Sequence, residues 1–312
     1  MEHQVSEVAD PGRALEALEW AAVRAEGGAA GPIVRANALD FRAASTASLA
    51  DTRRFLDRVM MASDAEAGLD ALLDAGALAA LLPEVEAMVG FGDGEWRHKD
   101  VWKHTKQVVR QAVPRLEIRW AALLHDIGKM KTRSISPDGE VHFFGHAEVG
   151  ARMFDKLHRR MPIFSSEESL RESVRFLILH HLRASQYDHS WTDSAVRRFT
   201  REMGPLLDDV LCLSRADITT KRPEKKKKGL RQISELADRV RKLATEDAKV
   251  PPLPSGIGDE IMRAFALPPS RLIGDVKRKL ETSIEAGELP AGQEAEFYLE
   301  LLRQDPTRFG LK

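Results

Sequence analysis

The stretch RWAALLHDIGK, residues 119–129, ends an apolar helical segment with a histidine and an aspartate. Apolar residues before His125 recur every three or four positions, which predicts that His125 shares their buried face, and Asp126 follows directly. The row consists of Ile118, Ala121, Ala122 and His125. Burying an imidazole and a carboxylate together is costly unless a partner compensates them. This stretch therefore predicts a functional site inside a helical fold.

Four more predicted helices carry one metal-binding side chain each in an apolar row. These side chains are His104, His146, His181 and Asp217. A single histidine in such a row is ordinarily a core residue with a hydrogen-bond partner. Five such rows together indicate a shared divalent cation, because neutral imidazole and carboxylate are natural ligands of Zn, Mn, Fe, Ni or Mg.

The composition predicts an all-α protein. Only 6% of the 312 residues are aromatic, with two tyrosines, while alanine and leucine are plentiful. Amphipathic periodicity predicts helices at 14–25, 52–61, 65–72, 76–82, 100–112, 117–127, 146–159, 168–182, 193–202, 205–219, 229–245, 258–266, 271–286 and 292–304. The strongest strand pattern is GEVHFF at 139–144, after the turn SPDG, and it predicts either a short hairpin or a loop.

We expect four parts along the chain. A partly flexible helical segment occupies residues 1–50, a helical neck-like segment 51–95, a metal-binding domain 96–247, and a small helical unit 256–312. The sequence VPPLPSG at 250–256 is the clearest linker.

Charge and cysteine content limit the binding partners and the cellular location that we expect. The net charge of −1 implies no bulk attraction to nucleic acid or to a membrane, so any such contact must be local. The one cysteine, Cys212, cannot form an internal disulfide. The N-terminal residues lack the apolar segment of a signal peptide, and no apolar run reaches the roughly 18 residues of a membrane span. We therefore expect a cytoplasmic protein without a membrane segment.

The ordered pattern of His104, the pair His125–Asp126, and Asp217 resembles the HD phosphohydrolase superfamily. A narrower resemblance is to the neck, HD domain and body of bacterial tRNA nucleotidyltransferases, the CCA-adding enzymes, over residues 50–310. The stretches that carry it are RHKDVWKHT (97–105), RWAALLHDIGK (119–129), FFGHAEVGARM (143–153), HLR (181–183), WTDSAVRRF (191–199), RADITTK (215–221) and GIGDEIMRAFALPPSRLIGDVKRKLE (256–281). The resemblance implies an HD helical bundle with a helical C-terminal extension.

The resemblance also implies a ligand set for one or two divalent ions. The first ion would be held by His104, His125, Asp126 and Asp217. Asp126 would bridge to a second ion held by His146 and His181. His180 is the alternative to His181, but it lies off the apolar row, and the HLR match favours His181.

Cations near Asp126 are expected to balance the charge of a phosphoryl group. Lys129 is the leading catalytic candidate beside Asp126, followed by Arg183 and Lys131. The alternative for Lys129 is a solvated position at a helix C-terminus.

A basic run, KRPEKKKK at 221–228, could guide a phosphate backbone, with Lys221 and Arg222 as its first contacts, or it could be a solvated loop. No aromatic residues are interleaved with the run, so it gives no support for reading bases. His98 and His142 are weaker candidates for contacts around the metal or the substrate.

These residues predict a metal-dependent phosphohydrolase acting on nucleotides or RNA ends, such as 2′,3′-cyclic phosphates or 2′-nucleotides, with tRNA as a further partner. The first fifty residues contain no D-x-D and no Gly-Gly loop before a strand, so we do not expect nucleotide addition by this chain alone. One alternative is an RNA-binding or partner-docking module with a vestigial metal site. Another is a signalling hydrolase of cyclic or polyphosphate nucleotides, although no GYP motif follows the HD pair.

Overall fold

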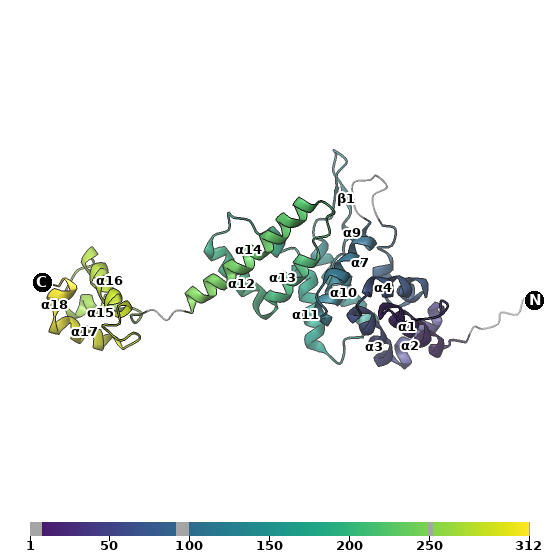
Figure 1. The fold of residues 1–312 in the computed structure, drawn as a ribbon, viewed down its shortest axis with the longest axis horizontal. Coiled ribbons are helices and arrows are strands. Elements are labelled where there is room, and N and C mark those ends of the chain that lie inside the picture. Colours follow the sequence, from purple (N-terminus) through teal and green to yellow (C-terminus); the bar gives the residue numbers. More distant parts are fainter. Residues whose placement is uncertain (1–7, 92–99, 249–251, 312) are drawn as a thin grey trace, which may run out of the picture. The chain divides into compact units, whose positions relative to one another are not determined.

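A computed structural model describes residues 8–91, 100–248 and 252–311. Their regular secondary structure is helical apart from one two-stranded hairpin (Figure 1), which confirms the predicted all-α class. They divide into two compact units, Met1–Val240 and Arg241–Lys312. No helix among the described residues combines the length and hydrophobicity that a membrane span requires.

The first unit begins with a cluster of helices in which α1 packs against α2, α3 and α4. The helices are α1 (Pro11–Ala25), α2 (Ala38–Ala47), α3 (Leu49–Met61), α4 (Ala65–Asp74), α5 (Ala77–Leu81) and α6 (Pro83–Glu86). The periodicity did not predict α2, although Asn37 and Asp40 form a capping box at its start. Because α3 begins at Leu49, the boundary predicted after residue 50 falls within its first turn.

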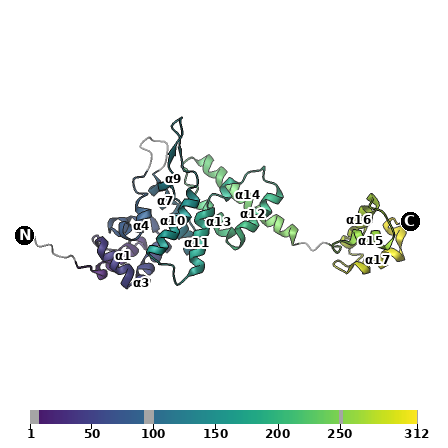
Figure 2. The same cartoon turned by 180° about the vertical axis from the view of Figure 1, so that it is seen from behind.

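The second part of this unit surrounds α8, in which every residue from Ile118 to Leu124 is buried. Helix α8 packs against α3, α7, α11 and α13. These four neighbouring helices are labelled in Figure 2. The helices here are α7 (Val101–Gln111), α8 (Leu116–Leu124), α9 (Lys129–Thr132), α10 (His146–Arg160), α11 (Glu168–His180), α12 (Asp193–Met203) and α13 (Leu207–Ala216), with short 3-10 turns at Ala184–Gln186 and Gly204–Leu206.

A close backbone contact fixes the start of α10 against the turn that follows α8. A Cβ atom added to Gly128 would lie 2.0 Å from the carbonyl oxygen of His146 and 2.7 Å from the amide nitrogen of Gly150. Only glycine permits this approach, because any side chain at residue 128 would overlap the backbone of α10.

The hairpin precedes α10. Strands β1 (Ser134–Ile135) and β2 (Val141–His142) pair antiparallel, with Ser134 opposite His142 and Ile135 opposite Val141. Of the two alternatives for this segment, the hairpin is therefore the one observed, although each strand has only two residues.

Helix α14 (Pro223–Asp247) begins six residues before the predicted start at 229. Proline is favoured in the first turn of a helix, because its ring fixes φ near the helical value and its missing N–H has no intrahelical partner there. Most of the lysine run at 221–228 is therefore helical, which corrects the interpretation of the run as a loop.

The second unit has a hydrophobic core of its own. It contains α15 (Ile257–Ala264), α16 (Arg271–Glu285), α17 (Ala295–Gln304) and α18 (Pro306–Phe309). Tyr298 is fully buried in this core, and its hydroxyl lies within hydrogen-bonding distance of the carbonyl oxygens of Pro252 and Pro290, at 3.1 and 2.8 Å. The linker predicted at 250–256 lies partly outside the described residues.

Candidate metal centre

Metal-binding side chains from several helices converge beside α8. Two sets of three share Asp126, and within each set the ligand atoms lie within 4.8 Å of one another. The first set is His104, His125 and Asp126, and the second is Asp126, His146 and His181. Asp217 lies 3.0 Å from His104, so all of the predicted ligand residues are close together, with Asp126 between the two sets. We call the two sets, with Asp217 added to the first, the first and second halves of the centre.

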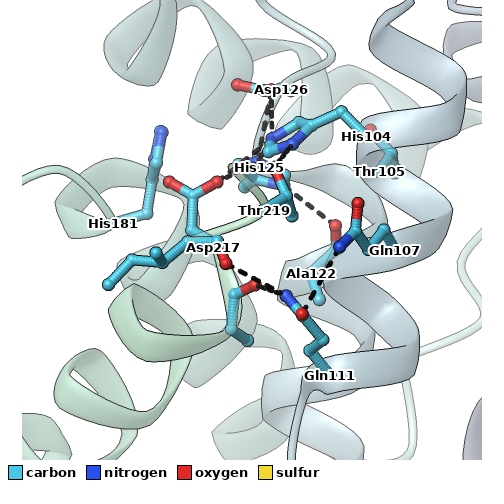
Figure 3. A network of polar contacts seen from close by, with 12 residues as sticks. His104, Thr105, Gln107, Gln111, Ala122, His125, Asp126, His181, Asp217 and Thr219 are labelled. Carbon is cyan, nitrogen blue, oxygen red and sulfur yellow. Dashed lines mark hydrogen bonds and ion pairs between the residues drawn. The ribbon is translucent and has the colours of Figure 1, made fainter. Parts of the chain in front are cut away.

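The first half is rich in carboxylate. His104 Nε2 lies 3.0 Å from Asp217 Oδ1 and 3.4 Å from Asp126 Oδ2. His125 Nε2 lies 3.2 Å from Asp126 Oδ2 and 3.6 Å from Asp217 Oδ1. The two rings are themselves close, with 3.4 Å between their Nε2 atoms (Figure 3). Two imidazoles and two carboxylates thus face one small volume.

The second half contains less negative charge. His146 Nε2 lies 3.5 Å from Asp126 Oδ1 and 3.2 Å from His181 Nε2. Asp126 therefore turns one carboxylate oxygen toward each half, as expected of a bridging ligand. His181 is 2% exposed, and a hydrogen bond from the Ser214 hydroxyl to its backbone carbonyl ties it to α13.

Three of the histidines are oriented by the same local hydrogen bond. The Nδ1 atoms of His125, His146 and His181 lie 2.9, 2.7 and 2.8 Å from the carbonyl oxygens of the residues three positions earlier. For His125 and His181 these carbonyls belong to Ala122 and Ile178, in the last turns of α8 and α11, where helix carbonyls lack an intrahelical partner. A carbonyl can only accept, so each Nδ1 must carry the proton, and in a neutral ring Nε2 is then free to bind a metal.

This arrangement fits a divalent cation. In neutral His146 and His181, both Nε2 atoms carry a lone pair, and they face each other 3.2 Å apart inside the protein. Two acceptors at this distance repel unless a proton or a cation lies between them. The donor set of imidazole and carboxylate suits Zn, Mn, Fe or Ni and accommodates Mg.

The electrostatics of the two halves differ. Burial disfavours a charged His125 ring, but Asp126 and Asp217 outweigh burial and raise the pKa of His125 to about 10. Burial also opposes ionisation of Asp126, yet the charge of His125 and hydrogen bonds from His104 and His125 hold the pKa of Asp126 well below its usual range. Burial and the nearby charge of His125 lower the pKa of His181 to about 4. Without metal, the first half therefore holds a proton on His125, and the two histidine rings of the second half are neutral.

Lys129 lies next to the bridging carboxylate. Its Nζ is 2.6 Å from Asp126 Oδ2 and 5.6 Å from the centre of the Phe143 ring. Its side chain is 21% exposed, so the ammonium group is only partly withdrawn from solvent. Lys129 is therefore not the wholly solvated lysine that the alternative prediction describes.

Other predicted site residues lie outside this cluster. Arg183 pairs with Glu202 and lines a separate cavity with Trp191 and Arg198. Lys131, Lys221 and Arg222 are exposed on the surface. His180 packs against Phe176, with 4.2 Å between ring centres and 48° between the planes, whereas His181 faces His146. His142 stacks on Phe144 in the hairpin, and His98 lies outside the described residues.

The sequence did not single out two residues that support the first half. The Thr219 hydroxyl lies 2.8 Å from His104 Nδ1 and holds that ring in place. The Gln111 side chain donates to the carbonyl oxygen of Ala216, 2.7 Å away, and so ties α7 to the end of α13 next to Asp217. Thr219 follows Asp217 by two residues, which is the one feature of the sequence that points to it.

Comparison with known proteins places this cluster in a family. Residues 101–222, which contain every one of these ligand residues, match the HD domain family. The chain thus contains an HD domain, and the His and Asp groups of this domain can hold a metal ion.

Relatives with known names extend the match beyond this domain. The chain is 30% identical over 252 residues to the A-adding tRNA nucleotidyltransferase of Deinococcus radiodurans, covering 78% of this chain and 56% of that protein. It is 30% identical over 253 residues to the CC-adding tRNA nucleotidyltransferase of Thermus thermophilus, covering 78% and 54%. A multifunctional CCA protein from Azoarcus sp. is 38% identical over 96 residues, covering 29% and 22%.

The chain is therefore an HD-domain protein homologous to bacterial tRNA nucleotidyltransferases over most of its length, which confirms the predicted resemblance. It spans about half the length of the first two relatives, 56% and 54%.

Proposed function

We propose that the chain is a metal-dependent phosphohydrolase that acts on nucleotides or RNA ends, with 2′,3′-cyclic phosphates and 2′-nucleotides as its first substrates. The observation that carries this proposal is the sharing of Asp126 by two sets of buried histidines. Such paired sites are typical of enzymes that cleave phosphate esters. Two relatives are tRNA nucleotidyltransferases by name. This supports an RNA end, and tRNA itself, as substrates of the chain.

In this proposal, His104, His125, Asp126 and Asp217 hold one divalent ion, and Asp126, His146 and His181 hold a second. When bound, such ions lower the pKa of water and offset the negative charge of a phosphoryl group. The carbonyl hydrogen bonds at Nδ1 keep the rings in the tautomer that binds metal. Burial of His125, Asp126 and His181 excludes bulk water from around the ligands.

Lys129 is the protein's own cation nearest the bridging carboxylate, so we propose that it balances charge on the phosphoryl group. Arg183 has Glu202 as its partner, and a role for it requires that this ion pair open. Lys131, Lys221 and Arg222 are exposed and remain proposed as contacts to a longer RNA backbone.

The test measures metal content and hydrolysis for the wild type, Asp126→Asn and Asp209→Asn. Asp209 is a matched control because it is a buried carboxylate that pairs with Arg115 instead of the histidines. Substrates are bis-p-nitrophenyl phosphate and 2′,3′-cyclic AMP with Mn²⁺, Ni²⁺ or Mg²⁺. We expect bound metal and turnover in the wild type and in Asp209→Asn. In Asp126→Asn, activity should fall at least about 1,000-fold, because the ions supply several kcal/mol of transition-state stabilisation.

A wild-type protein that binds no metal and hydrolyses neither substrate under any of these ions would overturn the proposal. Binding of tRNA by that metal-free protein would then support the alternative of an RNA-binding module with a vestigial site.

A further inference from the structure

The loop that leads into α10 leaves one phenylalanine side chain in solvent. Phe144 is 77% exposed, and among the described residues only Val8, the first of them, is a more exposed large hydrophobic residue. Exposing an aromatic ring forgoes the stabilisation that its burial would give. The Phe144 ring is therefore available to a molecule outside the chain.

Phe144 does not stand alone. Its ring lies parallel to that of His142, with 5.0 Å between the ring centres and 14° between the planes. Strand β2 ends at His142 and Phe144 lies in the turn that follows it, so the two rings stack where the chain leaves the hairpin. The high exposure of Phe144 leaves its other face open to a third flat ring.

The stacked pair is close to the metal centre because only one residue, Gly145, separates Phe144 from the ligand His146. Two trans peptide bonds separate Phe144 from the ligand His146, so their Cα atoms are at most about 7.6 Å apart. Gly145, with φ of 71°, turns the chain between the exposed ring and the buried ligand. The Phe143 carbonyl accepts the hydrogen bond of His146 Nδ1, while the Phe143 ring lies against Lys129.

We propose that His142 and Phe144 form a stacking platform for the nucleobase of a nucleotide whose phosphate is bound at the metal centre. This inference rests on the function proposed above and names its substrate class: phosphate esters that carry a base. Every base offers a flat π face, so the platform binds different bases without reading their edges. A protein partner is a poorer occupant, since specific interfaces bury about 800 Å² per partner, more than one phenylalanine exposes.

The test compares kcat/KM for 2′,3′-cyclic AMP with kcat/KM for glycerol 1,2-cyclic phosphate, a cyclic diester without a base. We expect Phe144→Ala to lower the ratio of the two values about 5- to 100-fold, the range that loss of one stacked base gives. Phe144→Trp should restore the ratio, because tryptophan also offers a flat ring. Ile135→Ala is the matched control, since Ile135 is a 59% exposed apolar residue of the same hairpin, and it should keep the wild-type ratio.

An equal loss on both substrates in Phe144→Ala would overturn the platform and assign Phe144 to the structure of the loop. An unchanged ratio would overturn it as well.

If the wild type hydrolyses neither substrate, the proposed function fails, and the platform is judged by binding alone. The probe is then 2′-AMP with Mg²⁺, added to the Phe144→Trp variant and compared with inorganic phosphate. Quenching of tryptophan fluorescence by 2′-AMP but not by phosphate would support the platform, and no difference would overturn it.

Discussion

The two halves of the metal centre share Asp126 but differ in charge. The first half places His104 and His125 between two carboxylates, Asp126 and Asp217. The second half places His146 and His181 beside one oxygen of Asp126, and their Nε2 atoms face each other. The first half therefore attracts positive charge strongly. The second half offers the lone pairs of two histidines and carries less negative charge.

This difference determines how each half exists without metal. In the first half, the raised pKa of His125 means that a proton stands in for the cation. In the second half, the lowered pKa values of His146 and His181, both caused mainly by burial, leave the rings neutral and repelling each other. We infer that the second half depends more on the rigidity of its surroundings, because its two neutral rings do not attract each other.

The largest effect should come from the backbone contact that supports the second half. Gly128→Ala would place a methyl group 2.0 Å from the carbonyl oxygen of His146, so α10 must move away and take His146 with it. We expect a loss of about 2–3 kcal/mol in the free energy of unfolding, measured with urea, and loss of the second ion.

Gly150→Ala is the control for this substitution. Its added Cβ would meet Ile178 Cγ2 at 3.4 Å and the nitrogen of Gly128 at 3.5 Å, which are ordinary contacts. It should retain both ions and most of the stability. Equal behaviour of the two variants would show that the close approach at Gly128 does not hold the second half in place.

Removal of one ligand from each half should separate the two ions. We expect His104→Gln and His181→Gln each to lower metal content by about one ion per chain and activity by about 100-fold or more. Metal analysis after gel filtration gives the stoichiometry. If either variant lost both ions, or neither, the division into two halves that meet at Asp126 would be wrong.

The pH dependence of metal binding should also differ. A metal must displace the proton of His125, whose pKa is raised to about 10, so the affinity of the first half should rise about tenfold per pH unit below that value. The second half should be nearly independent of pH above about pH 5, because His181, with its pKa lowered to about 4, is already neutral there.

Dissociation constants for Mn²⁺ in the single-half variants test this contrast. His181→Gln retains the first half, and its affinity should change about 100-fold between about pH 6 and pH 8. His104→Gln retains the second half, and its affinity should change less than about threefold. Parallel slopes would mean that the two halves do not differ in protonation.

The smallest effect should come from the support of His104. Thr219→Val removes the hydroxyl that lies 2.8 Å from His104 Nδ1, and we expect about tenfold weaker metal binding in the first half only. Thr220→Val is the control, since the Thr220 hydroxyl accepts from the amide of Arg222. A similar loss in both variants would assign the effect to the loop and not to the ring.

The helical class and the meeting of the ligand residues follow from spacing in the sequence. Rows of apolar residues with one polar member direct that member inward, and burying several such members together requires a common partner. The same reasoning ranked His181 above His180, and the structure turns His181 toward His146. Local periodicity in the sequence is therefore sufficient to predict these features.

Other features depend on contacts that periodicity does not contain. His125 and His181 lie just past the ends of their helices, where unpaired carbonyls orient the rings, whereas the sequence predicted helices that continue through both residues. Thr219 acts across 115 residues of chain, and Arg183 is held by Glu202. Such pairings arise only once the helices have packed.

The ligand residues come from segments spread between His104 and Asp217, and this gives a bound ion a role as a cross-link. An ion held by these residues links the segments of the folded chain. The unfolded chain does not assemble the site, so the ion adds stability in proportion to the logarithm of its free concentration. The C-terminal unit has a core without any of these ligands. We therefore expect the unfolding temperature of the first unit, and not that of the C-terminal unit, to follow the supply of metal ions.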